Sequence, residues 1–344
     1  MAKNDSLGRL YGMSAVIALG ILLAAFIISG PGAVIPIAAL AVIEVTFSFD
    51  NAVINSEVLA RMNARWQTVF LTVGIAVAVF GVRFLLPLVM VSSTTGHSLG
   101  HVFDLALHNP GQYSLELHEA YPLIASFGGI FLLMLGMRFF GEKKEVHWLK
   151  PLESLIADFN QPWWYSIAGA LAALAAIRFV LARGEPRLVV AGLLGALTFL
   201  AIKGLSELLV HLQPSHKRAV LATGWIALVY FLYLEILDAS FSFDGVIAAF
   251  AITKEVFLIA AGLGIGALFV RSMTLHLLRR ETLQSYRYLI HGAHYAITTL
   301  AIMLLITIRY DIPDLVTGFL GLTFIAAAFY SSVRHNRREH APLI

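Results

Sequence analysis

Two copies of a short acidic motif, FSFD, lie inside long apolar segments of this 344-residue chain. The copies end at Asp50 and Asp244, and another carboxylate precedes each by six residues, Glu44 in the first copy and Asp238 in the second. An ionised side chain at the centre of a bilayer costs about 2.5–3.5 kcal/mol on insertion scales, so such residues face a cavity, pair with cations or remain protonated. The two motifs therefore predict a buried polar site with a function.

The side chains in and around the motifs are hard oxygen ligands. They are carboxylate, amide and hydroxyl groups, neither motif contains histidine, and the chain has no cysteine, which excludes thiolate metal sites and thiol catalysis. Oxygen sets of this kind suit Mg²⁺, Ca²⁺ and Mn²⁺, and several carboxylates offset a divalent charge better than a monovalent one. We therefore predict a divalent-cation site. Its candidate ligands are Glu44, Asp50, Asn51, Asp238, Asp244, Glu235, Ser48 and Ser242, with Thr46 nearby.

Two arginines offer a competing explanation for the buried acids. Arg83 and Arg271 could form internal ion pairs, but two guanidinium groups cannot neutralise the five carboxylates of the candidate site. By residue count both arginines lie about 23–24 Å along their spans, well away from the middle. They either form a gate by pairing with an acid when the site is empty, or extend toward the interface as snorkelling residues. Both alternatives stay open.

The composition indicates a membrane protein. Hydrophobic residues make up 59% of the chain and charged residues 13%, with a mean hydropathy of +0.81, whereas a soluble domain has about 25% charged residues. Several segments reach the roughly 18–20 apolar residues that span a bilayer, and alternating strand patterns are absent. We expect an all-α polytopic membrane helical bundle, with the lipid bilayer as its surroundings and no nucleic-acid partner. The ten predicted helices lie at 11–29, 32–58, 67–92, 121–141, 164–182, 187–210, 219–252, 256–279, 287–309 and 313–332.

Basic residues predict how these helices are oriented. With both termini in the cytoplasm, sixteen Lys and Arg residues fall on the inner side and four on the outer side, which is a strong positive-inside bias. We therefore expect a protein of the cytoplasmic membrane whose polar N-terminus leads into a retained first helix. The largest outer loop is predicted at 93–120 and the largest inner loop at 142–162.

The two motifs belong to a longer internal repeat. At an offset of 244 − 50 = 194 residues, IEVTFSFD aligns with LDASFSFD. A loop shorter by six residues then brings Arg83 onto Arg271 and Gly74 onto Gly262. The motif helices are five spans apart and so cross in opposite directions, which predicts a 5+5 inverted repeat with its substrate site near the bilayer midplane. The predicted repeats are 1–182 and 183–344.

Both motifs favour a break in their helix. On a straight helix the two carboxylates of one motif point about 120° apart, so they converge better if the helix opens between them. Cap and turn residues are common at both motifs and favour such an opening, although tertiary packing can hold a helix continuous through them. These residues are Ser48, Asp50, Asn51, Ser242, Asp244 and Gly245.

The segment from Glu44 to Asn51, with a Glu six residues before the Asp of a Phe-Asp-Asn sequence, resembles the TerC-like integral membrane proteins, named for tellurite resistance. The duplicated FSFD motifs look most like the uncharacterised branch of that superfamily. Members are implicated in manganese efflux, and more distant relatives carry Mn²⁺ or Ca²⁺. The resemblance therefore implies that Glu44, Asp50 and Asn51 are ion-site residues.

The second half departs from that family pattern at one position. Asp238 and Asp244 match the two acids, but Gly245 stands where the resemblance implies an Asn. A ligand is therefore missing there, and Glu235, one turn before Asp238, is an extra acid that could compensate. This departure leaves the identity of the metal open.

Further polar and small residues occur at helical spacing elsewhere. His291 and His294, near the cytoplasmic end of the ninth helix, are a candidate entrance, with metal ligation, a proton relay and ordinary hydrogen bonding as alternatives. A histidine-rich stretch of the outer loop fits an ordinary solvated surface better than a metal exit; it contains His97, His101, Asp104 and His108. Glycines of the eighth helix predict close helix packing; they are Gly262, Gly264 and Gly266.

These patterns favour a secondary transporter that exports a divalent cation, Mn²⁺ first, with the metal as substrate and no resident cofactor. Because no P-loop is present, coupling to protons or to the membrane potential is expected, and no enzymatic activity. One alternative is an intramembrane aspartyl-type hydrolase built on two Asp residues, although the chain contains no GxGD sequence. Another is a membrane sensor that binds metal without transporting it.

Overall fold

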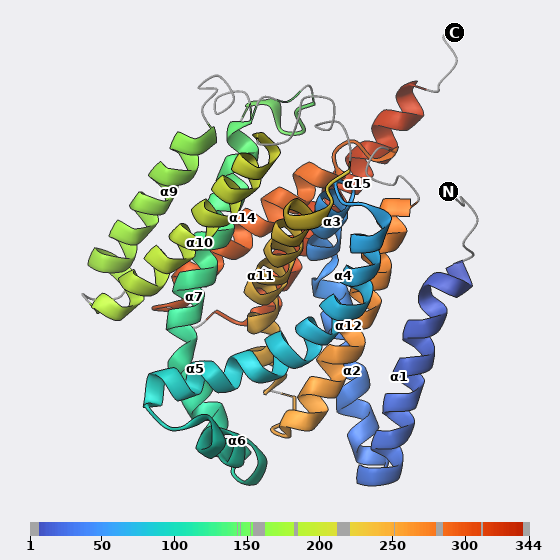
Figure 1. The fold of residues 1–344 in the computed structure, drawn as a ribbon, viewed down its shortest axis with the longest axis vertical. Helices are drawn as coiled ribbons and strands as arrows, with labels where there is room; N and C mark the ends of the chain where they lie inside the picture. Colours follow the sequence, from blue (N-terminus) through green and yellow to red (C-terminus); the bar gives the residue numbers. More distant parts are fainter. Residues whose placement is uncertain are drawn as a thin grey trace. The chain divides into compact units, whose positions relative to one another are not determined.

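The computed structural model describes residues 7–142, 144, 146–151, 153, 162–181, 185–211, 221–250, 252–279, 285–310 and 312–339. Its elements within these ranges are all helices (Figure 1). Nine of the described helices are long and apolar enough to cross a membrane, and one bent pair supplies a tenth span. The predicted all-α membrane bundle is confirmed.

The bent pair consists of α2 (Pro31–Phe47) and α3 (Phe49–Leu59). One span is built from three consecutive pieces, α4 (Ala64–Ala76), the π-helical η1 (Val77–Leu85) and α5 (Leu86–Thr95). The remaining helices are α1 (Leu7–Ser29), α6 (Leu99–His108), α7 (Pro110–Gly141), α9 (Pro162–Ala176) continued by η2 (Ile177–Leu181), α10 (Pro186–His211), α11 (Gly224–Ala249), α12 (Val256–Arg279), α14 (Leu289–Thr307) and α15 (Asp314–Glu339).

The chain divides into two compact units. Unit 1 consists of Met1–Pro122 and Ser206–Arg279, and unit 2 consists of Leu123–Leu205 and Arg280–Ile344. Each unit thus combines a segment from the first half of the chain with one from the second. The predicted repeats at 1–182 and 183–344 were defined by sequence similarity, whereas these units are defined by contacts. The two divisions describe different properties, so the repeats stay a prediction.

Unit 1 is held together by close approach of α12 to α2, with α1 against both helices. A Cβ added to Gly262 would lie 2.6 Å from the Cβ of Leu40, and one added to Gly266 would overlap the side chain of Glu44. Only glycine allows this separation of the helix axes, since any larger residue would push them apart. The predicted close packing of the α12 glycines is therefore confirmed.

The two motif spans of unit 1 run antiparallel. Where α3 ends, the Asn63 amide donates to the Ala222 carbonyl oxygen (3.2 Å) and the Ala222 amide donates to the Arg61 carbonyl oxygen (2.8 Å), so this end lies beside the start of α11. At the other end, a Cβ on Gly245 of α11 would lie 3.2 Å from Glu44 Oε2 on α2. Opposite directions are what an inverted repeat requires of its two motif helices.

The segment 93–120, predicted to be a loop, is mostly helical. Helix α5 continues to Thr95, Gly96 takes a left-handed conformation (φ 76°), and Ser98 caps α6 by accepting from the His101 amide (3.3 Å). A left-handed glycine followed by a Ser cap is the usual way for one helix to end and the next to begin without a long loop. The predicted inner loop 142–162 lies largely outside the described residues.

Unit 2 packs through glycines as well. A Cβ on Gly292 of α14 would lie 2.5 Å from the Cβ of Ala328 on α15, and one on Gly129 of α7 would lie 2.9 Å from the side chain of Leu305 on α14. Small residues let membrane helices approach closely, because van der Waals packing replaces the hydrophobic effect within lipid.

Candidate cation site in unit 1

The first motif lies at a break between two helices. Helix α2 ends at Phe47 and α3 begins at Phe49, with 57° between their axes. Ser48 forms the joint (φ −96°, ψ 20°), and its hydroxyl donates to Glu44 Oε1 at 3.2 Å. The predicted opening of the first motif helix is confirmed.

The second motif does not open. Helix α11 runs without interruption from Gly224 to Ala249, through FSFD, so of the two alternatives left open for this motif the continuous helix is the one observed. The hydroxyl of Ser240 donates to the Ile236 carbonyl oxygen one turn earlier (2.9 Å), an arrangement that satisfies a hydroxyl inside a continuous helix. Tertiary packing of α11 against α3 and α4 then outweighs the weak helix propensity of the motif.

Asp50 lies in the first turn of α3 and is buried. Its Oδ1 accepts from the backbone amide of Asn51 at 2.8 Å, and it makes no ion pair with a described residue. The first turn of a helix exposes free amide groups and carries partial positive charge, which stabilises a carboxylate there. The break after α2 thus places a carboxyl group inside unit 1 without an arginine partner among the described residues.

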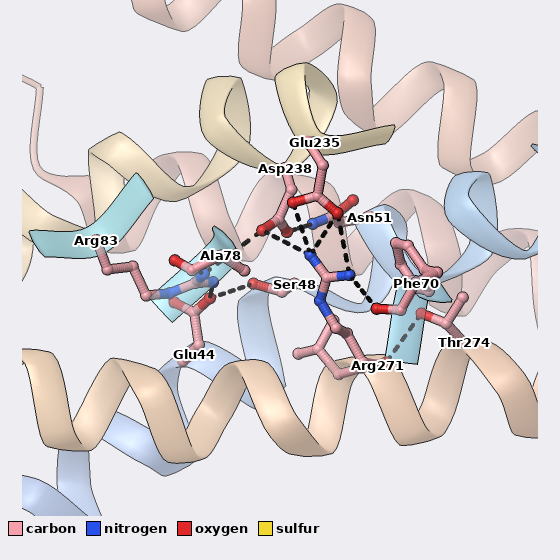
Figure 2. A network of polar contacts seen from close by, with 11 residues as sticks. Glu44, Ser48, Asn51, Phe70, Ala78, Arg83, Glu235, Asp238, Arg271 and Thr274 are labelled. Atoms are coloured by element: carbon pink, nitrogen blue, oxygen red, sulfur yellow. Dashed lines mark hydrogen bonds and ion pairs between the residues drawn. The ribbon is translucent and has the colours of Figure 1, made fainter. Parts of the chain in front are cut away.

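Arg83 joins the two motifs. Its Nη2 lies 2.5 Å from Glu44 Oε1, and its Nη1 lies 3.5 Å from Asp238 Oδ2 and 3.1 Å from the Ala78 carbonyl oxygen (Figure 2). Arg83 belongs to η1, whose wider π-helical turn changes the direction in which its side chains point relative to an α-helix. This side chain, 2% exposed, is buried among acids from both halves of the chain.

Arg271, on α12, pairs with two acids of the second motif helix, α11. Its Nη2 lies 3.2 Å from Glu235 Oε2 and 3.6 Å from Asp238 Oδ2. Its Nη1 donates to the Phe70 carbonyl oxygen at 2.8 Å, and its guanidinium lies 4.1 Å from the centre of the Phe70 ring (Figure 2). Asp238 is therefore shared by both arginines.

Both arginines reach the acids of the two motifs, although residue counting puts their Cα atoms away from the middle of their spans. A long arginine side chain carries its charge several ångströms along the helix from its own Cα, so position in a span is a poor guide to where the charge lies. Of the two alternatives for these residues, ion pairing is the one observed.

The arginines leave the cluster with excess negative charge. Two guanidinium groups pair with three described carboxylates, and Asp50, next to Asn51 in the chain, is a fourth buried acid of unit 1. When all six groups are ionised, their formal charge is 2 − 4 = −2. The four acids are Glu44, Asp50, Glu235 and Asp238. A formal charge of −2 equals the charge that one divalent cation would neutralise.

Buried oxygens without partners lie on the same helices. In the described part of the chain Asn51 Oδ1, Asn55 Oδ1 and Ser242 Oγ are buried and make no hydrogen bond. The amide of Asn51 is nonetheless oriented, since its Nδ2 donates to Asp238 Oδ1 at 2.8 Å. Unsatisfied buried oxygens are costly, and a bound cation or water is a common reason for their presence. Asn55 was missed by sequence reasoning; its signal is a second amide one turn after Asn51.

The structure brings most predicted site residues into one network. Glu44, Ser48, Asn51, Glu235 and Asp238 meet there with the two arginines (Figure 2). The side chain of Asp244 lies outside the part of the chain that the structure describes. Thr46 instead donates to the Val42 carbonyl oxygen of its own helix.

The geometry limits how a metal could bind. Within the described ranges, no group of three or more His, Asp or Glu side chains converges as an all-protein metal site would require. The carboxylates of Glu44, Glu235 and Asp238 are engaged by arginine. A cation at this site would therefore compete with guanidinium groups and keep water among its ligands.

The predicted histidine entrance belongs to unit 2. His291 Nε2 lies 2.9 Å from the Val146 carbonyl oxygen and 3.5 Å from Glu153 Oε2. His294 Nδ1 lies 2.9 Å from the Ile290 carbonyl oxygen, and its ring stacks on Phe139. Both side chains are buried and each ring has one hydrogen-bonded nitrogen, while His291 Nδ1 is buried without a hydrogen-bond partner among the described residues. The three alternatives for these histidines stay open.

The histidines singled out in the segment 93–120 lie on or next to α6. His108 Nδ1 lies 2.8 Å from Asp104 Oδ1, and the rings of His97 and His101 are 4.7 Å apart between centroids. His108 and Asp104 are largely exposed, as expected of a solvated surface.

Residues 49–339 match the model of a family described as proteins of unknown function, DUF475. The chain belongs to this family. No curated protein and no solved structure matches it. The family match begins inside the first FSFD motif and extends over both arginines and the second motif, so almost the whole candidate site lies within it. The resemblance to TerC-like proteins stays a prediction.

Proposed function

We propose that this protein is a secondary transporter that moves a divalent cation, Mn²⁺ first, across the cytoplasmic membrane. The observation that carries the proposal is the excess of buried acids in unit 1, where three described carboxylates pair with two guanidinium groups and a fourth, Asp50, is buried without an arginine partner among the described residues. Purely structural ion pairing does not need the additional acids, because burying an uncompensated carboxylate is costly. Excess buried acids inside a membrane are typical of an ion pathway.

Within this proposal the arginines serve as internal counter-ions. When the site is empty, Arg83 holds Glu44 and Asp238, and Arg271 holds Glu235 and Asp238. An arriving cation competes for the same oxygens and displaces a guanidinium group from at least one of them. Occupancy of the site is thereby linked to the positions of η1 and α12, which carry the two arginines.

The break between α2 and α3 supplies further polar groups for the proposed cation site. Asp50 and the first-turn amides of α3 lie at the joint that follows Ser48, and discontinuous helices of this kind form ion sites in several transporter folds. Asn51 Oδ1 and Ser242 Oγ are neutral oxygens that can complete the ligand set with water. Export as the direction follows from the resemblance to TerC-like proteins.

The hydrolase alternative fits the described geometry less well. An aspartyl dyad needs two carboxylates that share a proton at close range. Asp238 instead accepts from Asn51 and pairs with both arginines, so its oxygens face donors and not a second carboxyl group. We therefore propose no enzymatic activity for the protein.

The experiment that tests this proposal is Mn²⁺ uptake into proteoliposomes that contain a Mn²⁺-sensitive dye. Wild-type protein should give flux, and Asp50→Asn should reduce it by at least about tenfold, as loss of a metal-site residue typically does. Glu57→Gln is the matched control, since Glu57 lies on the same helix α3 but pairs with Arg61 at the surface. The control should retain flux.

Two outcomes would contradict the proposal. If folded wild-type protein gives no flux of Mn²⁺, Ca²⁺ or Mg²⁺ but binds one of them, the sensor alternative is favoured. If Asp50→Asn transports as well as Glu57→Gln, the cluster is not the pathway.

A further inference from the structure

The repeat predicts a symmetrical pair of contacts between the motif helices. The offset of 194 residues maps Glu44 onto Asp238 (44 + 194 = 238) and Asn51 onto Gly245 (51 + 194 = 245). The contact between Asn51 and Asp238 therefore has a counterpart between Gly245 and Glu44.

Both contacts are present in the structure. Asn51 Nδ2 donates to Asp238 Oδ1 at 2.8 Å. In the counterpart, a Cβ built on Gly245 would lie 3.2 Å from Glu44 Oε2. Among the described residues that are not part of its own helix turn, this oxygen is the neighbour it would meet within 4 Å. The two antiparallel helices thus face each other in the same way at both positions, with an amide side chain at one and none at the other.

Because Gly245 has no side chain, it offers no hydrogen-bond donor to the carboxylate of Glu44. Asp238 accepts from Asn51 and pairs with Arg83 and Arg271, so both of its oxygens are engaged. Glu44 uses Oε1 for Arg83 and Ser48, while its Oε2 accepts no hydrogen bond from a described residue. An Asn at position 245 would place an amide donor beside this oxygen.

We infer that Gly245 keeps Glu44 Oε2 free as a cation ligand, so that a partly hydrated divalent cation binds on the first-motif side of the network. This inference rests on the proposed function and specifies where within the site the cation lies. A Cβ at position 245 would lie only 3.2 Å from Oε2, so glycine leaves this oxygen accessible to the cation or to one of its water ligands. Divalent cations such as Mg²⁺ commonly keep several waters when a protein offers few carboxylates.

The test compares Gly245→Asn with Gly245→Ala in metal-free lipid nanodiscs. Ala has a higher helix propensity than Asn, so propensity alone would make Gly245→Ala the more thermostable variant. A hydrogen bond from the new amide to Glu44 predicts the reverse order. Adding Glu44→Gln to each variant removes the charged acceptor, and the advantage of Asn over Ala should then shrink or disappear.

The same variants test cation binding through the Mn²⁺-induced rise in unfolding temperature. Wild type should show a rise that depends on Mn²⁺ concentration. Gly245→Asn should weaken Mn²⁺ binding by about tenfold or more, since an amide then engages the ligand oxygen in place of the cation or its water ligand. Gly245→Ala should weaken it less. Gly245→Ser, with a smaller donor, provides the same comparison if the Asn variant does not fold.

The two proposals fail in different ways. If wild type shows no response to Mn²⁺, Ca²⁺ or Mg²⁺, the proposed function fails, while a higher metal-free stability of Gly245→Asn still supports a free Glu44 oxygen at this position. If wild type responds and Gly245→Asn binds Mn²⁺ as tightly as Gly245→Ala, the inference about Gly245 is overturned and the transporter proposal is unaffected.

Discussion

Asp238 is the residue on which the polar network of unit 1 depends most. It receives a hydrogen bond from Asn51 and pairs with Arg83 and Arg271, so groups from α3, η1 and α12 all converge on one carboxylate. Removing one partner from a buried ion pair costs more than the pair contributes, because the remaining charges stay buried without compensation.

We expect Asp238→Asn to lower the free energy of unfolding by about 3 kcal/mol, the lower end of the range for breaking a buried pair, since each arginine keeps a second carboxylate. Denaturant unfolding in nanodiscs measures this value. Glu57→Gln is the control, because its pair with Arg61 is at the surface and contributes less than about 1 kcal/mol. Equal stability of the two variants would show that Asp238 is not central to the network.

For individual residues, the sequence predicted the positions of the acidic side chains better than the contacts of the two arginines. A carboxylate inside an apolar run is so costly that its position alone singles it out, and Glu44, Glu235 and Asp238 were found in this way. For the arginines the sequence left ion pairing as one alternative among several, because their charge lies far from their Cα atoms and η1 further alters where Arg83 points. Neither the reach of a side chain nor a π-helical turn has a clear signature in the sequence.

Among the elements, the span formed by α4, η1 and α5 depends on one glycine. A Cβ on Gly74 would lie 2.6 Å from Glu235 Oε1 and would overlap the guanidinium of Arg271. The ion pair between α11 and α12 therefore passes directly against the backbone of α4, which only glycine allows.

We expect Gly74→Ala to destabilise the protein by about 1–3 kcal/mol, because the methyl group must displace a buried ion pair. Gly81→Ala, in the same span, is the matched control. Its Cβ would meet only Val77 Cγ1 at an ordinary 3.6 Å, so stability should change by less than about 1 kcal/mol. Thermal unfolding of the two variants makes the comparison. A Gly74→Ala variant as stable as Gly81→Ala would contradict the described packing.

The helices were largely predictable and their breaks were not. Apolar runs of 18 residues or more identified most spans within a few residues, since the bilayer imposes that length. Two bounds were wrong: α7 begins at Pro110, not at 121, and α15 continues to Glu339, beyond 332, because polar residues extend both helices past their apolar runs. Similar cap residues occur at both motifs, yet only Ser48 ends a helix. The difference lies in tertiary packing, which cap propensities of about 1 kcal/mol cannot override.

For the whole molecule, orientation in the membrane is the property that the charge pattern predicts. Ala64 and Gly100 are separated by one span, Ala64–Thr95, and are expected on the inner and outer side respectively. The chain has no cysteine, so single cysteines can report the side on which each residue lies without removing any others.

We expect Gly100→Cys to react with a membrane-impermeant maleimide on intact cells, and Ala64→Cys to react only after permeabilisation. Nothing lies within 4 Å of the Cβ position of Gly100, so the new thiol is accessible. The opposite pattern would invert the predicted topology and reverse the direction in which flux assays must be read. Labelling of both residues from one side would contradict the span itself.

The interleaved composition of the two units has a consequence for biosynthesis. Unit 1 requires residues up to Arg279, so it cannot be completed while the first half alone has left the ribosome. Arg83 precedes Asp238 by 155 residues, which at 5–20 residues per second is a delay of about 8–31 s. During that interval Glu44, already synthesised, is the acid available to the arginine. The pair within the first half is therefore the early contact, and arrival of α11 in the bilayer completes the network.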